Sequence, residues 1–403
     1  MNERIQPLEI QTYIKLAQKN DVISFAAGLP DLSVLPLSQL KEVYLQLAEE
    51  SDRSFQYQST SVHLKTKIQN IMAKKSVPCQ LDEILIINGA QQGIFLTAHL
   101  WFREKASLLI EEFVYPGFLQ VANLFNLNYL PIPSLFNEGI DLDYLETILK
   151  TKKTLPYLYI VCNGHNPQGI TWNTQLRKEL AALADRYNFI IIEDDPYGFL
   201  SFSDEEYLPM RSYTKNAIYI SSFSKIISPA LRTGWIVGDK EIIQKLEQLK
   251  DMNDLSVSNP NHLVVNRFLD SFSLPQVIEP QVKLYNKKLE CMITALNEHM
   301  EIEFNYVKPQ HGMFVWLEFP HINIERHKEY LFEKSKTLFI PGSAFAVDKS
   351  INKQAMRLNF TYPSCEEIQL GIKKLNDSII NLPAFSRRSP RIASIHRQEL
   401  TVA

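Results

Sequence analysis

A lysine lies in a short loop that is rich in hydroxyl groups and also contains an arginine. Lys225 follows Ser222 and Ser224, and Arg232 comes a little further along the same loop. A partly desolvated amine with a cationic neighbour has a lowered pKa, and its neutral form can attack a carbonyl carbon to give a Schiff base. Lys225 is therefore our candidate nucleophile. The alternative, which such a loop would favour on its own, is a solvated surface lysine.

An amide, a carboxylate and a phenol follow two neighbouring apolar runs. The runs, at 157–162 and 189–192, flank a helical pattern and so predict a βαβ crossover with parallel strands. Asn166 follows the first strand, and Asp194 and Tyr197 follow the second, which brings all three to one edge of a sheet. Asp194 could instead cap a turn or belong to a solvated acidic cluster.

A glycine turn follows a third apolar run, at 84–87. Ala90 and Gln91 then begin a helical pattern that continues through Trp101. Free backbone amides and the positive end of a helix dipole face such a turn, so a phosphate could bind there. Every strand-to-helix junction shares this pattern, however, and an ordinary turn is the alternative.

Four further residues have both a binding and a packing interpretation. Tyr115 precedes a Pro-Gly turn, where its ring could cover a planar ligand or pack locally. Arg357 alternates with apolar residues in a predicted strand and could bind a carboxylate or make a salt bridge at a sheet edge. Gly28 lies in a turn that could approach a ligand or be an ordinary loop, and Tyr57 is ambiguous.

The composition points away from nucleic acids and membranes. A formal net charge of -3, from 42 basic and 45 acidic residues, gives no overall field for a polyanion. No signal peptide and no membrane-spanning run is evident, which predicts a cytoplasmic protein. The four widely spaced cysteines, Cys79, Cys162, Cys291 and Cys365, argue against a disulfide framework or a metal site and favour buried thiols.

The chain is long enough for more than one hydrophobic core. Its 403 residues predict two α/β units. The expected organisation is an N-terminal helix and loop at 1–35, a large domain at 36–260, a small domain at 261–381 and a loosely ordered basic tail at 382–403. Helices are predicted at 37–50, 61–75, 174–187, 240–251 and 262–299, with a loop at 256–261. Strands of the small domain are predicted near 304–306, 314–317, 338–340 and 355–360.

As a set, these residues resemble the motifs of the fold-type I pyridoxal-phosphate (PLP) enzymes. The nearest pattern is that of the class I/II aminotransferases, in the branch of the 2-aminoadipate and kynurenine aminotransferases, over about residues 20–375. Asn166 begins a sequence similar to the family's Asn-Pro-x-Gly, Asp194 to Tyr197 resembles its Asp-x-x-Tyr, and Ser222 to Lys225 resembles its Ser-x-Ser-Lys. The resemblance implies a large domain with a mainly parallel sheet flanked by helices, and a smaller α/β domain.

The resemblance also implies roles at a PLP site. Lys225 would hold PLP as an internal aldimine and, once displaced by substrate, move the proton between the substrate Cα and the cofactor. Asp194 would pair with the pyridinium nitrogen, so that the ring can accept electrons. Asn166 and Tyr197 would hydrogen-bond the ring's phenolic oxygen, and Tyr115 would stack on the ring.

The remaining implied roles concern the phosphate and the substrate. The groups expected to bind the phosphate are Ala90, Gln91, Ser222, Ser224 and Arg232, with the partner subunit's Tyr57. Arg357 would bind the substrate α-carboxylate in a bidentate fork, beside Asn166 and a covering segment around Gly28. The implied assembly is a homodimer with shared sites.

These roles predict an aminotransferase that moves an amino group from an α-amino acid to a 2-oxo acid by a ping-pong route. The alternatives are other PLP chemistry, such as β-elimination, and a non-catalytic PLP-dependent sensor. Arg357 argues against decarboxylation, because it favours substrates that keep their carboxylate.

Some positions differ from the family's usual pattern and leave the substrate open: His165, Gln168, Ser61 and Lys65. Related regulators carry an N-terminal winged-helix module. Because the chain begins almost directly at the aminotransferase-like part, we expect a stand-alone enzyme.

Overall fold

A computed structural model of the protein describes residues 15–17, 21–50, 56, 61–104, 107–151, 157–348, 351 and 354–382. Tyr57, nearly all of the predicted N-terminal helix and nearly all of the predicted basic tail lie outside the described residues. None of the described helices is long and apolar enough to cross a membrane.

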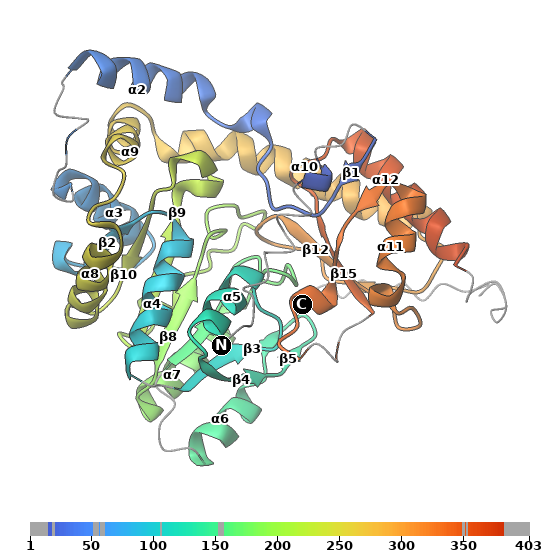
Figure 1. The fold of residues 1–403 in the computed structure, drawn as a ribbon, viewed down its shortest axis with the longest axis horizontal. Coiled ribbons are helices and arrows are strands. Elements are labelled where there is room, and N and C mark those ends of the chain that lie inside the picture. Colours follow the sequence, from blue (N-terminus) through green and yellow to red (C-terminus); the bar gives the residue numbers. More distant parts are fainter. Residues whose placement is uncertain are drawn as a thin grey trace.

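A large, mainly parallel sheet carries most of the chemistry-bearing loops (Figure 1). In the part of the chain that the structure describes, its order is β2-β10-β9-β8-β7-β3-β4. These strands are β2 Ile84–Ile87, β3 Ser107–Glu111, β4 Asn128–Ile132, β7 Tyr157–Ile160, β8 Ile190–Asp194, β9 Ala217–Ser222 and β10 Gly234–Val237. Only β10 runs antiparallel to its neighbours in this sheet as described. The predicted parallel pairing of β7 with β8 is confirmed.

Helices cover both faces of this sheet because its strands are apolar on both sides. Leu108 and Ile110 of β3 pack with α4 (Ala90–Glu104), α5 (Pro116–Leu124) and α8 (Lys240–Asp254). Leu109 faces the other way, toward α6 (Leu142–Thr151) and α7 (Thr174–Tyr187). This alternation along a strand that is buried on both faces is what a parallel sheet requires. The predicted α/β class is confirmed.

A second sheet lies beside the first and has the order β11-β12-β15-β14. Its strands are β11 Asn305–Tyr306, β12 Phe314–Glu318, β14 Ile340–Pro341 and β15 Ala355–Asn359, and its helices are α10 Leu274–His299, α11 Ile324–Ser335 and α12 Cys365–Ile380. The N-terminal strand β1 (Ile23–Ser24) pairs in parallel with β13 (Thr337–Leu338). The segment after β1 is therefore attached to the C-terminal part of the chain.

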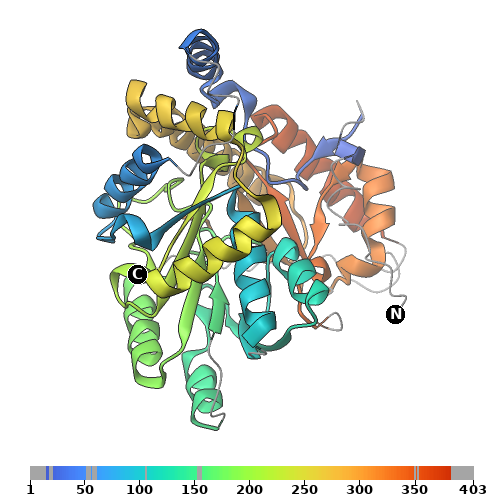
Figure 2. The ribbon, with the colours of Figure 1, turned by 60° about the vertical axis from the view of Figure 1, so that its left-hand side comes forward.

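Two further helices, α2 (Leu37–Glu50) and α3 (Val62–Lys74), both pack against α9 (Asn259–Ser271). Figure 2 shows α2 at the top of the molecule, beyond α9. Helix α3 packs beside β2 as well.

The predicted single helix at 262–299 is wrong, because the structure has α9 and α10 there. The first of them already begins at Asn259, inside the predicted loop at 256–261, and ends at Ser271. Pro275 in the first turn of α10 accounts for the break, since proline cannot donate the backbone bond that a continuing helix needs.

The sequence also left β4 unassigned. Pro131 lies within this strand, which pairs only with β3 among the described strands. A proline inside an apolar run argues against a central strand and is tolerated at an edge, so the signal for β4 was weak. The short hairpin β5 (Ser134–Leu135) and β6 (Gly139–Ile140) was missed as well.

The cysteine prediction is half right. Cys79 and Cys162 are buried free thiols, as expected. Cys291 of α10 and Cys365 of α12 instead form a disulfide, although 74 residues separate them in sequence. Such a pairing depends on how the two helices pack, which residue spacing does not reveal.

Candidate active site

The predicted site residues meet in one cavity at the ends of the large sheet's strands. It has a volume of about 220 Å³ and is lined by Gly28, Ala90, Gln91, Ile94, Tyr115, Val161, Asn166, Asp194, Pro196, Tyr197, Ser222, Ser224, Lys225, Pro229, Arg232, Phe314 and Arg357. Every predicted site residue that the structure describes is among them. The sequence reasoning missed Ile94, Val161, Pro196, Pro229 and Phe314.

The missed residues had weak sequence signals. Ile94 and Phe314 were assigned to a helix and a strand as apolar packing residues, and apolar residues in such elements usually form core. Val161 was assigned to the apolar run before Asn166. Pro196 and Pro229 lie between predicted site residues, which was the one usable hint.

Lys225 ends a short 3-10 turn, Phe223–Lys225, that follows β9. Its amine donates a hydrogen bond to the Gly28 carbonyl at 2.8 Å. Burial, together with the positive charges of Arg232 and Arg357, lowers the pKa of this amine to about 8. A larger share of the Lys225 amine is therefore neutral near physiological pH than in an exposed lysine. The predicted role as a nucleophile requires this neutral form.

Hydroxyl, guanidinium and amide groups gather on one side of the cavity. The Ser222 and Ser224 hydroxyls lie 2.7 Å apart, and Arg232 donates to Ser224 Oγ at 3.2 Å. Arg232 also donates to the Asn88 carbonyl at 3.2 Å, which joins this loop to the start of α4. A Cβ at Gly89, which has φ +81°, would come within 2.4 Å of the guanidinium. The turn therefore needs glycine, and the cluster has the chemistry of an anion site.

Asp194 is buried at the end of β8 and is only half satisfied. Its Oδ2 accepts a hydrogen bond from the Tyr159 hydroxyl at 2.7 Å, whereas Oδ1 has no partner among the described residues. Burial raises the pKa of Asp194 to about 7, against the Tyr159 hydrogen bond, and the negative charge of Asp195 adds to the rise. An ionised Asp194 would be stabilised by a cationic donor placed at Oδ1.

The neighbouring Asp195 has a different environment. Its carboxylate accepts hydrogen bonds from the Tyr219 hydroxyl at 2.8 Å, from Asn163 Nδ2 at 3.1 Å and from the Gly198 amide at 2.7 Å. Asp195 does not line the cavity. The solvated acidic cluster considered from sequence is therefore wrong, because both carboxylates are buried.

Arg357 is 1% exposed and lies between two acceptors. Its NH1 donates to Asn166 Oδ1 and its NH2 to the Ala26 carbonyl, both at 2.5 Å. The guanidinium carbon lies 3.9 Å from the ring centre of Phe314 and 4.7 Å from that of Phe345. Burial lowers the pKa of Arg357 to about 10, which still leaves a cation at neutral pH. Arg357 forms no salt bridge with the described residues, so the sheet-edge salt bridge considered from the sequence is wrong.

Two tyrosines complete the cavity. Tyr197 is buried, packs edge-on against Phe314 with ring centres 5.9 Å apart, and its pKa is raised by burial. Tyr115 is the N-cap of α5, and burial raises its pKa as well. A Cβ at Gly117 would come within 2.4 Å of the Tyr115 ring, so the glycine lets the ring lie against the helix start.

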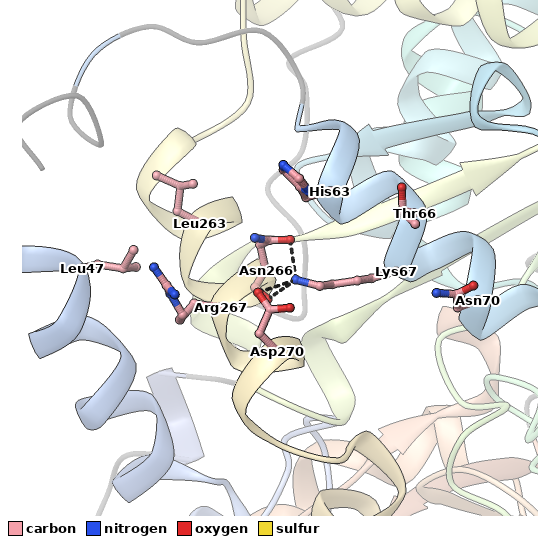
Figure 3. A pocket seen from close by; sticks show the side chains of 9 residues that line it. All are labelled: Leu47, His63, Thr66, Lys67, Asn70, Leu263, Asn266, Arg267 and Asp270. Carbon is pink, nitrogen blue, oxygen red and sulfur yellow. Dashed lines mark hydrogen bonds and ion pairs between the residues drawn. The ribbon is translucent and has the colours of Figure 1, made fainter. Parts of the chain in front are cut away.

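A larger cavity, of about 420 Å³, lies between α2, α3 and α9 (Figure 3). Its Lys67 amine is already bonded to the Asn266 carbonyl at 2.7 Å and to Asp270 at 2.7 Å. None of the predicted site residues lines it. No group of three or more His, Cys, Asp or Glu residues that could hold a metal ion occurs in the described ranges.

Comparison with known proteins identifies the family. Residues 20–375 match the family model described as aminotransferase class I and II. The chain belongs to the class I and II aminotransferases. The fold is that of the fold-type I enzymes, and this aminotransferase is PLP-dependent, as the sequence predicted.

Several characterised aminotransferases are similar over nearly the full length. Aromatic-amino-acid aminotransferase 1 of Thermococcus litoralis is 32% identical and covers 92% of this chain and 91% of its own. A kynurenine aminotransferase of Pyrococcus horikoshii, solved in complex with PMP, superposes with a TM-score of 0.88 at 30% identity, over 94% of this chain and 96% of its own. The α-aminoadipate aminotransferase of Thermus thermophilus, solved with N-(5'-phosphopyridoxyl)-L-leucine, has a TM-score of 0.84 at 28% identity, over 93% and 95%.

Proposed function

We propose that PLP binds in the cavity around Lys225, and that there the aminotransferase moves an amino group from an α-amino acid to a 2-oxo acid. The observation that supports this most is the pairing of a part-buried amine of lowered pKa with a buried, half-satisfied carboxylate in the same cavity. A strongly perturbed amine and acid in one cleft are typical of a reactive site.

The residues present fit PLP at three separate points. Oδ1 of Asp194 lacks a partner within the described structure and would accept a hydrogen bond from the protonated ring nitrogen. The hydroxyls of Ser222 and Ser224, together with Arg232 and the N-terminus of α4, suit a phosphate dianion. Tyr115 lines the cavity as a flat ring that can cover a planar heterocycle. Two relatives solved with PMP or a phosphopyridoxyl compound support the same cofactor.

When bound, PLP supplies an electron-accepting ring that stabilises negative charge on the substrate's Cα. The protein's residues would supply binding, orientation and proton transfer. Lys225 Nζ would hold the cofactor covalently and, once released, would move a proton at the substrate's Cα. Asp194 would keep the ring nitrogen protonated, and Asn166 and Tyr197 would hydrogen-bond the ring's phenolic oxygen.

Arg357 would bind the substrate's α-carboxylate. Its guanidinium stays charged, is held at two ends and keeps Nε unpaired within the described structure, so it has donors left for a carboxylate. Gly28 and Asn166 would border the same substrate. Keeping the carboxylate bound while a proton moves at Cα is what transamination needs, and it opposes loss of that group as CO2.

We further propose a homodimer in which the partner subunit's Tyr57 reaches the phosphate. Met252 and Leu255, at the end of α8, are 77% and 69% exposed, and Asp254 between them bonds Asn88 at the phosphate side of the cavity. A second copy would cover these apolar side chains beside the site. Light scattering on the purified protein checks this, and a monomer at micromolar concentration contradicts it.

Borohydride reduction tests the cofactor assignment. It fixes a lysine-bound PLP irreversibly, and peptide mapping then locates the pyridoxyl label. We expect one label per chain on Lys225 and none in Lys225→Ala. A label on another lysine, or no label after incubation with PLP, overturns the assignment.

The amino donor is identified by a panel of single amino acids. Aromatic, branched, acidic and 2-aminoadipate donors are each mixed with the PLP-loaded protein, and release of the matching 2-oxo acid is measured. Relatives named for aromatic amino acids, kynurenine and α-aminoadipate set the range of the panel. The donor with the highest kcat/KM names the activity.

A further inference from the structure

A buried histidine and a buried glutamate lie next to the cavity without lining it. His165, in the loop after β7, and Glu111, the last residue of β3, are each 1% exposed. Nε2 of His165 lies 3.1 Å from Oε2 of Glu111. Oε1 of the same carboxylate accepts a hydrogen bond from the Val161 amide at 2.8 Å. Glu111 thus connects two strand ends of the large sheet.

The other ring nitrogen of His165 fixes the ring's proton. Nδ1 accepts a hydrogen bond from the Gln168 amide at 3.3 Å, so the neutral form of the ring carries its proton on Nε2. Nε2 and Glu111 Oε2 are in close contact, although this contact does not have the geometry of a hydrogen bond. The backbone is held as well, since the His165 amide donates to the Ile170 carbonyl at 2.8 Å and the His165 carbonyl accepts from the Gly169 amide at 2.6 Å. The loop is therefore attached at both the side chain and the backbone of one residue.

The residue that follows His165 in the chain belongs to the candidate active site. Asn166 follows His165, lines the cavity and receives Arg357 NH1 on its side-chain oxygen. Glu111, at the other end of the pair, belongs to the strand that leads to Tyr115. The His165–Glu111 contact thus joins the two loops that carry Asn166 and Tyr115, which line the same cavity.

We propose that His165 and Glu111 form a positioning pair that holds Asn166 against Arg357 and thereby sets the affinity for the substrate's carboxylate. The pair touches neither substrate nor cofactor. This inference rests on the proposed role of Arg357. A guanidinium without a fixed acceptor at NH1 has more freedom to rotate, and a bidentate fork loses affinity when its orientation is not held.

Glutamine provides a discriminating substitution at position 165. Its side-chain oxygen can accept the Gln168 amide proton, and its NH2 group can donate to Glu111, so both contacts of the neutral imidazole are reproduced. Leucine fills a similar volume but offers neither group. Asparagine is polar, yet it is too short to bridge the same two partners.

The experiment compares His165→Gln, His165→Leu and His165→Asn with the parent holoenzyme. The exposed pair His321–Glu303, at 3.3 Å, supplies a matched control in His321→Leu. Four quantities are measured. KM and kcat are determined for the best donor, per Lys225-labelled site, and the melting temperature is recorded. The Kd of 3-phenylpropanoate, a carboxylate without an amino group, is measured by calorimetry.

We expect His165→Leu and His165→Asn to raise KM and the Kd of 3-phenylpropanoate roughly tenfold, with kcat changed far less. His165→Gln and His321→Leu should match the parent within roughly twofold. If a variant turns over too slowly to assay, the Kd of 3-phenylpropanoate still tests the positioning role. If His165→Leu does not fold, His165→Asn provides the same test.

Three results would overturn the inference. One is His165→Gln being as impaired as His165→Leu. The second is a lower melting temperature with unchanged KM and Kd, which would mean that the pair supports only the fold. The third is loss of kcat alone. Failure of the proposed function is distinguishable from all of these, because the parent itself would then carry no label on Lys225.

Discussion

Burial of an amine between two arginines gives Lys225 its chemical character. Its pKa of about 8 arises first from desolvation and then from the positive charges of Arg232 and Arg357. Only the neutral amine attacks an aldehyde, and its share rises as the pH approaches this pKa from below.

The rate of covalent PLP attachment should follow this titration. At saturating PLP, we expect the first-order rate constant for the apoprotein to rise with pH and to level off above about 8. Stopped-flow absorbance measures it. A rate that keeps rising toward pH 10 would mean that Lys225 titrates like an exposed lysine.

The two adjacent carboxylates should separate function from stability. Asp194→Ala removes the acceptor at the cavity and leaves one buried donor, the Tyr159 hydroxyl, unpaired, so we expect loss of retained PLP with a smaller loss of apoprotein stability than in Asp195→Ala. Asp195→Ala leaves two buried donors and one part-buried donor without an acceptor, and each buried donor left unpaired costs about 1–3 kcal/mol. We therefore expect a lower free energy of unfolding and smaller effects on PLP. Urea unfolding measures the stability of each variant, and cofactor absorbance measures the PLP that each retains. Equal loss of PLP in the two variants would contradict the assignment of Asp194 as the partner of the ring nitrogen.

At the scale of elements, one N-terminal segment covers the cavity through its carbonyl groups. The Gly28 carbonyl accepts from Lys225, and the Leu29 carbonyl accepts from Thr361 Oγ1 at 2.9 Å. Beyond them, Asp31 Oδ2 pairs with Lys288 of α10 at 2.5 Å, and Lys288 also donates to the Thr361 carbonyl at 2.9 Å. The side chain of Lys288 is 5% exposed and that of Asp31 is 19% exposed, so this ion pair is partly shielded from water.

Removing that buried charge should loosen the segment. We expect Lys288→Met to lower the free energy of unfolding by about 1–2 kcal/mol, because the part-exposed Asp31 and the Thr361 carbonyl both lose a donor, and to raise KM for the amino acid. The matched control is Lys283→Met, which breaks an exposed pair with Glu279 on the same helix. Hydrogen exchange at the amides of residues 25–31 should quicken only in Lys288→Met. Equal exchange in both variants would mean that Lys288 does not hold the segment.

Elements with a strong apolar pattern and a clear cap were predictable from sequence. The β7–α7–β8 crossover is an example, because Asn173 caps the helix and both strands are fully apolar apart from their ends. Weakly patterned elements were not, as β4 with its internal Pro131 shows. The break between α9 and α10 was hidden because apolar spacing continues on both sides of it.

At the scale of the whole molecule, the site was predictable because parallel strands place their carboxyl ends at one edge. The sequence alone therefore predicted that groups from distant parts of the chain, such as Asn166, Asp194 and Lys225, lie close together. Partners that depend on side-chain packing were not predictable. The His165–Glu111 contact and the Phe314 ring below Arg357 are of this kind, and neither follows from residue spacing.

The Cys291–Cys365 disulfide joins two helices of the second sheet's layer. We expect its reduction, or Cys291→Ser, to lower the free energy of unfolding by about 2–4 kcal/mol, because a cross-link limits the unfolded chain. Denaturant unfolding with and without reductant measures this. Cys291→Ser should be insensitive to the reductant, and an insensitive parent would mean that the bond does not form.

In our proposal Lys225 carries PLP in this cavity, and the protein transfers amino groups there. The most direct measurement is a single half-reaction: the PLP-loaded protein is mixed with one amino acid and no oxo acid. We predict one equivalent of the matching 2-oxo acid per Lys225 site, together with conversion of the bound cofactor to its pyridoxamine form. Both signals should be absent in Lys225→Ala. Across the donor panel, no oxo acid and no pyridoxamine form from a correctly labelled protein would contradict the account.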